Sequence, residues 1–158
     1  MAAKTVVRGP GEGDAVWMLD SLFATRASSD ETDGALTVME MTVAPGMGPP
    51  PHVHDSQETV YVLEGQARYH INGETYEGGP GTIFHVPAGI EENFEPAGSQ
   101  PLRVLVVYTP GGMDKFFAEA GEPAQRHELP QPSQTPPDLE RLGRSSGSDE
   151  SQRSTGSS

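Results

Sequence analysis

The chain of 158 residues is long enough for one domain with additional segments, but a hydrophobic fraction of 34% predicts that part of it stays outside a packed core. The formal net charge of -13 excludes the basic surface that nucleic acids or anionic membranes require. Because the sequence contains no cysteine, any metal site would depend on nitrogen and oxygen ligands.

The N-terminal segment MAAKTVVRGPGEGD lacks the apolar stretch of a signal peptide. No apolar run elsewhere approaches the length of about twenty residues that a membrane-spanning helix needs. We therefore expect a cytoplasmic protein with neither a membrane nor a nucleic-acid partner.

Short strand-like segments follow one another, separated by Gly, Pro and the hairpin signal Asn72–Gly73. This spacing is typical of an all-β sandwich or barrel. Residues 102–108 are apolar on both faces, which predicts a strand covered on both sides. The segments are ALTVMEMTVAPG (35–46), TVYVLEG (59–65), ARYHING (67–73), GTIFHVPAG (81–89) and PLRVLVVYTPGG (101–112).

One helix is predicted at about 113–120, MDKFFAEA, and it ends at Gly121. Phe116 and Phe117 are expected to hold it against the barrel. Residues 122–158 are rich in Pro and Ser and carry few large apolar side chains, so we predict a disordered tail there.

The segment GMGPPPHVHDSQETVYVLEG, residues 46–65, contains the clearest chemical pattern. Residues two apart on an extended chain face the same side, so His52 and His54 point together, and Glu58 has the same parity. The three prolines before them make the backbone that leads into this motif rigid. Two imidazoles and a carboxylate on one wall can bind a divalent metal.

The spacing of these residues resembles the first motif of the cupin family at every fixed position. Those positions are Gly46, His52, His54, Glu58 and Gly65. The TPGGMDKFFAEAG segment also resembles the ending of bacterial monocupins related to quercetin dioxygenase.

The second cupin motif is matched at Gly81, Pro87 and Gly89, but Glu92 stands where the family has its last histidine ligand. Three interpretations of Glu92 stay open. In the first, Glu92 ligates the metal, so that two carboxylates cancel the charge of the divalent ion and make the ligand set harder. In the second, it is a free general base beside a triad of His52, His54 and Glu58. In the third, it points to solvent and the site is weak or empty.

The resemblance implies a cupin jelly-roll β-barrel, also called a double-stranded β-helix, with the metal in its mouth. One cupin domain would span residues 1–121, with the barrel at about 14–110. The implied ligands are His52, His54, Glu58 and Glu92. The implied metal is a divalent transition ion, with Fe, Mn or Ni preferred and Zn, Co or Cu as alternatives.

Three functions are compatible with this resemblance. The first is a metal-dependent dioxygenase of a small aromatic, flavonoid or polyketide-like molecule, with Glu58 and Glu92 as catalytic carboxylates. The second is a non-redox isomerase or cyclase of polyketide-type metabolism that needs a metal. The third is a non-catalytic cupin that binds a small molecule. Relatives often pair through barrel faces, so we expect a homodimer, although the apolar strand 102–108 is equally compatible with a monomer.

The remaining histidines are assigned no ligand role. His85 shares a face with Ile83 and is predicted to be structural, with a place in the barrel lumen as the alternative. His70 is predicted to be exposed, and His127 lies at the start of the tail.

Overall fold

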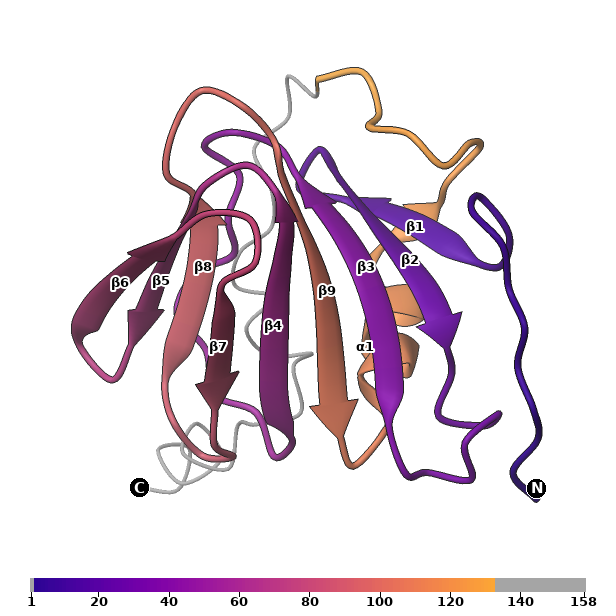
Figure 1. Ribbon diagram of the computed structural model, residues 1–158. Helices are drawn as coiled ribbons and strands as arrows, with labels where there is room; N and C mark the ends of the chain where they lie inside the picture. The colour runs from indigo at the N-terminus through magenta and orange to yellow at the C-terminus, as the bar shows by residue number, and fades with distance from the viewer. Residues whose placement is uncertain (1, 133–158) are drawn as a thin grey trace, which may run out of the picture.

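The computed structural model describes residues 2–132, which form ten strands and one helix (Figure 1). The predicted all-β class with a short C-terminal helix is confirmed. The elements are β1 (Ala15–Met18), β2 (Ser21–Ala27), β3 (Thr37–Val43), β4 (Gln57–Glu64), β5 (Ala67–Ile71), β6 (Glu74–Gly78), β7 (Ile83–Val86), β8 (Glu92–Pro96), β9 (Leu102–Thr109), α1 (Met113–Ala120) and β10 (Glu122–Pro123).

The strands form two antiparallel sheets (Figure 1). The large sheet has the order β10-β1-β2-β3-β9-β4-β7, and the small sheet has the order β6-β5-β8. Burial alternates strictly along β3 and β9, as expected for strands with one face turned to a core. The core joins side chains of both sheets, including Met39 and Val106 of the large sheet and Tyr69 of the small one, all 0% exposed.

The prediction that β9 is covered on both faces is wrong. Val104 and Val106 point into the core, whereas Leu105 and Val107 on the opposite face are only half-buried. The outer face of β9 therefore carries apolar side chains that are not fully covered. This explains why the sequence of β9 resembles that of a doubly buried strand.

The Asn72–Gly73 hairpin is confirmed. It joins β5 to β6 with φ of 51° at Asn72 and 82° at Gly73, the left-handed pair that a two-residue turn of this kind requires. The turn pairs Ile71 with Glu74 and fixes the register of the small sheet.

Helix α1 lies behind β3 and β9, on the inner side of the large sheet (Figure 1). Phe117 is buried and stacks on Phe23 of β2 with ring centroids 5.0 Å apart, and Phe116 packs against the same core. Both phenylalanines therefore hold the helix to the barrel as predicted.

Residues beyond the helix continue along β1. β10 pairs with β1, and the Trp17 indole donates a hydrogen bond of 2.8 Å to the carbonyl oxygen of Glu128. The Arg126 guanidinium lies 5.3 Å from the centre of the Trp17 ring. Residues 133–158 of the predicted tail lie outside the described part of the chain. Within the described residues, no helix is long and apolar enough to cross a membrane.

Candidate metal centre

A backbone bridge brings together two segments that are far apart in the sequence. The amide of His52 donates a hydrogen bond of 3.0 Å to the carbonyl oxygen of Glu92. The amide of Glu92 donates one of 2.8 Å to the carbonyl oxygen of His52. His52 lies in the connection between β3 and β4, and Glu92 is the first residue of β8. This bridge places the start of the small sheet beside the histidine motif.

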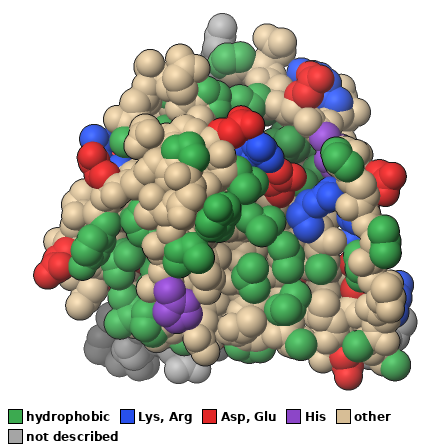
Figure 2. All heavy atoms as spheres, in the orientation of Figure 1, with side chains coloured by type: hydrophobic (Ala, Val, Ile, Leu, Met, Phe, Trp, Pro, Cys, Tyr) green, Lys and Arg blue, Asp and Glu red, His purple; other side chains and the backbone are tan. Residues whose placement is uncertain are grey.

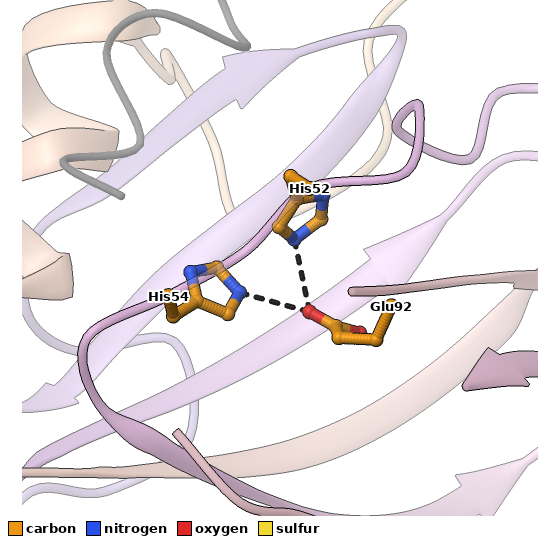
Figure 3. Close-up of side chains that lie close together, drawn as sticks. All are labelled: His52, His54 and Glu92. Carbon is orange, nitrogen blue, oxygen red and sulfur yellow. Dashed lines mark hydrogen bonds and ion pairs between the residues drawn. The ribbon is translucent and has the colours of Figure 1, made fainter. Parts of the chain in front are cut away.

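The two imidazoles converge on one carboxylate oxygen (Figure 3). Oε1 of Glu92 lies 3.0 Å from Nε2 of His52 and 2.9 Å from Nε2 of His54. The centroids of the two imidazole rings are 4.5 Å apart, so the prediction that both side chains point to the same side is confirmed. The three residues offer ligand atoms within 4.8 Å of one another, which is a suitable spacing for a single ion.

The orientation of His52 is fixed by the proline segment. Its Nδ1 lies 2.7 Å from the carbonyl oxygen of Pro50, and because a carbonyl can only accept, the proton sits on Nδ1. This contact turns Nε2 toward Glu92. A second hydrogen bond of this kind is the usual support for a metal-binding histidine.

Glu92 also carries a buried oxygen without a partner. Among the described residues, the buried side-chain atoms that lack a hydrogen bond are Oε2 of Glu92, Nδ1 of His54 and Oγ of Ser56. A buried carboxylate oxygen without a partner is costly, and a cation beside Glu92 would remove that cost. Nitrogen and oxygen donors together fit the divalent transition metals that the family motif implies.

Glu58 is held differently from the other three predicted ligands. Its Oε2 accepts a hydrogen bond of 2.6 Å from the Tyr69 hydroxyl, and the residue is 1% exposed. Glu58 lines the same cavity as His52 and His54 but stands outside the three-residue cluster.

The two carboxyl groups have opposite tendencies to ionise. Burial raises the pKa of Glu58 well above its usual value, and the nearby charge of Glu92 adds to this effect. Burial also opposes ionisation of Glu92, but hydrogen bonds with His52 and His54 outweigh it and hold the pKa of Glu92 below its usual value. For His52, burial lowers the imidazole pKa, but the hydrogen bond and the charge of Glu92, together with the hydrogen bond to Pro50, raise it above its usual value.

A small cavity that opens to solvent adjoins the cluster. Four of its lining residues are polar or ionisable: His52, His54, Glu58 and Tyr108. None is Lys or Arg, so the wall offers no permanently charged cation to an anionic ligand. The apolar part of the wall consists of Met18, Phe23, Met41, Val43, Pro49, Pro50, Phe94, Met113, Phe116 and Phe117.

The structure settles one interpretation of Glu92 and the placement of the other histidines. Glu92 is 2% exposed, so the interpretation in which it points to solvent is wrong. His85 is exposed on the outer face, where Nδ1 lies 2.9 Å from Oγ1 of Thr59, and the alternative that placed it in the lumen is also wrong. His70 is half-buried rather than fully exposed, within hydrogen-bonding distance of Thr75 and Glu95. His127 donates to the carbonyl oxygen of Gly13 at 3.0 Å.

Comparison with known proteins identifies the family. The model of the cupin domain matches residues 39–108, a range that contains His52, His54, Glu58 and Glu92. The chain belongs to the cupin family, and its fold is the jelly-roll β-barrel that the sequence motifs predict.

The relatives are distant. Quercetin 2,3-dioxygenase of Bacillus subtilis is 31% identical over 121 residues, which is 76% of this chain and 36% of that enzyme. The chain thus spans about a third of the enzyme's length. An RmlC-like cupin from Shewanella frigidimarina has a TM-score of 0.61 and 15% identity, covering 72% of this chain and 96% of that one. The polyketide cyclase RemF from Streptomyces resistomycificus has a TM-score of 0.56 and 22% identity, covering 90% and 96%. At such identities the two solved structures show the fold alone.

Proposed function

We propose that this chain is a metal-dependent cupin enzyme acting on a small aromatic, flavonoid or polyketide-like molecule, and that it is a dioxygenase. The observation that carries the proposal is the convergence of Nε2 of His52 and His54 on Oε1 of Glu92 beside a largely apolar cavity. The 31% identity to quercetin 2,3-dioxygenase supports the reaction class.

His52, His54 and Glu92 are the proposed metal ligands, with Fe, Mn or Ni preferred and Zn, Co or Cu also compatible with the donors. When bound, a redox-active metal supplies Lewis acidity and electron exchange with dioxygen. Glu58 was predicted as a ligand too, but its hydrogen bond from Tyr69 favours a role as the acid–base group.

Residues around the proposed metal site bind the substrate and transfer its proton. The cavity wall excludes water and gives an aromatic ligand apolar contact through side chains such as Phe94 and Phe117. Glu58 faces this cavity and exchanges a proton with a hydroxyl or enol group of the substrate at its carboxyl oxygen. Tyr69 holds that carboxyl in place through the 2.6 Å hydrogen bond.

Elemental analysis followed by oxygen uptake tests the proposal. Protein purified without chelators should contain Fe, Mn or Ni and consume oxygen when flavonols are added, whereas a Glu92→Ala variant should do neither. A metal-loaded protein that takes up no oxygen with any flavonol would contradict the dioxygenase assignment. Protein that binds no metal at all would contradict the metal-dependent enzyme itself.

A non-redox isomerase or cyclase is the second candidate. Burial favours the neutral acid form of Glu58, since it raises the pKa of this carboxyl, and a neutral acid in an apolar cavity can protonate a carbonyl compound without oxygen. The fold similarity to a polyketide cyclase is compatible with this chemistry. Turnover under nitrogen by Zn-loaded protein would favour this candidate. Ligand binding without any conversion would favour a non-catalytic binding protein instead.

We further propose a homodimer formed through the outer face of the large sheet. Figure 2 shows hydrophobic side chains gathered on this face over β4, β7 and β9. Tyr61 and Ile83 are 41% and 62% exposed and are direct cross-strand partners, and Leu105 pairs with Tyr61 on the next strand. Contiguous exposed apolar surface of this kind marks an interaction site.

A further inference from the structure

We infer that Asp114 is a positioning residue that fixes helix α1 as a wall of the cavity and so sets the affinity of the cavity for apolar ligands. The inference rests on the proposed function, because it takes this cavity as the substrate site. Asp114 does not line the cavity and lies in the first turn of α1, so its effect would be exerted through the helix.

Helix α1 supplies Met113, Phe116 and Phe117 to the cavity wall. The helix has only eight residues, and its N-cap residue, Gly112, makes no side-chain capping hydrogen bond. A helix this short is not stable by itself, so its position depends on contacts with the barrel. Any contact that anchors its first turn therefore shapes the cavity.

Asp114 provides that anchor with both carboxylate oxygens. Oδ1 accepts a hydrogen bond of 2.7 Å from the Thr37 hydroxyl, and Oδ2 accepts one of 3.2 Å from the Ser29 hydroxyl. Oγ1 of Thr37 also accepts from the amide of Gly112 at 3.1 Å. Thr37 is 0% and Ser29 6% exposed, while Asp114 is half-buried, so these charge-assisted bonds are partly shielded from water. We name Asp114, Thr37 and Ser29 the helix latch.

The other end of α1 is held by the backbone. The amide of Gly121 donates to the carbonyl oxygen of Phe117 at 2.9 Å, and β10 then pairs with β1. At the N-terminal end, side-chain hydrogen bonds add to the packing of Phe116 and Phe117, so a substitution in the helix latch weakens the hold on the helix there. Lys115 offers a matched control, because its ion pair with Asp30 at 3.1 Å joins two side chains that are 66% and 60% exposed.

The test is a fluorescence titration of the full, metal-loaded chain with the uncharged apolar dye N-phenyl-1-naphthylamine. Asp114→Ala and Thr37→Val should each weaken dye binding about tenfold, because each removes a partly buried, charge-assisted hydrogen bond and lowers the fraction of chains with a formed cavity. Lys115→Ala and the hydroxyl-retaining Thr37→Ser should stay within about twofold of the wild type. Amide hydrogen exchange in residues 113–120 should accelerate in the two weakened variants only.

Dye affinity within about twofold of the wild type in both Asp114→Ala and Thr37→Val would overturn the inference. Equal loss of affinity in Thr37→Ser and Thr37→Val would do the same, because the loss would then not follow the hydroxyl. If Asp114→Ala does not fold, the dye affinities of Asp114→Asn and the two Thr37 variants test the inference instead. Metal content separates the two proposals: a wild type without metal overturns the proposed function, while the response of dye affinity still decides the helix latch.

Discussion

The Tyr69 hydroxyl donates a hydrogen bond of 2.6 Å to Oε2 of Glu58, and the two side chains are 0% and 1% exposed. This pair gives the two carboxyl groups of the candidate centre different environments. Glu58 is buried beside a phenol and favours its neutral form, whereas Glu92 is ionised between two imidazoles. Environments that move the pKa values of two neighbouring acids apart separate a proton-carrying group from a charged one. The geometry thus favours Glu92 over Glu58 as the metal ligand.

The first prediction concerns the pH dependence of stability in the metal-free protein. Because burial raises the pKa of Glu58 above its ordinary value of 4.5, the folded state keeps this proton after the unfolded chain has lost it. The contribution of Glu58 to stability is therefore full below pH 4.5 and falls as the pH rises above it. Glu58→Gln should gain stability over the wild type by up to about 1.4 kcal/mol per pH unit in that range. Urea unfolding in EDTA from pH 5 to 8 measures this difference.

Tyr69→Phe is the matched variant for this prediction. The hydrogen bond from Tyr69 lowers the pKa of Glu58 and so partly offsets the effect of burial. Its removal raises the pKa of Glu58 further, so the loss of stability should continue to a higher pH than in the wild type. If Glu58→Gln and the wild type show parallel pH profiles, the carboxyl is not held neutral in the folded protein.

The second prediction separates the two carboxylates by metal affinity. Glu92→Ala should weaken metal binding by at least about 100-fold, because it removes the oxygen that both imidazoles face. Glu58→Gln should retain the metal. Glu91→Ala is the control, since Glu91 is the adjacent, exposed acid. Equilibrium dialysis followed by elemental analysis gives the three affinities, and retention of the metal by Glu92→Ala would exclude Glu92 as a ligand.

The sequence predicts the histidine motif well because the information there is local. Side chains alternate along an extended chain, so the spacing of His52 and His54 is enough to place both imidazoles on one side. The Asn72–Gly73 turn is predicted for the same reason, since its conformation depends on two adjacent residues.

Long-range pairing accounts for what the sequence does not reveal. The position of Glu92 depends on its backbone bridge to His52, and the engagement of Glu58 depends on the approach of Tyr69 from the other sheet. Met18 and Met113 reach the cavity from opposite ends of the chain. No local spacing encodes such contacts. For β9, hydrophobicity alone could not distinguish a covered face from the uncovered apolar face that the structure shows.

The third prediction tests the proposed dimer. Ile83→Glu places a charge at the most exposed apolar position of the outer sheet face and should convert a dimer to a monomer. Tyr76→Glu is the control, because Tyr76 is 46% exposed but belongs to the small sheet. Light scattering coupled to gel filtration reports the mass of each variant. A monomeric wild type, or a dimer that survives Ile83→Glu, would contradict this interface.

The fourth prediction concerns the charge of the metal centre. Glu92→His restores the family's histidine at this position and replaces an anionic donor with a neutral one, so a bound divalent ion keeps one more positive charge. The variant should therefore still bind metal, and it should be harder to oxidise than the wild type, with a higher reduction potential. Its preference should also shift from Mn and Fe toward Cu, since imidazole is a softer ligand than carboxylate. Redox titration and competition between metals measure both effects. An unchanged potential and an unchanged metal preference would show that position 92 does not contact the ion.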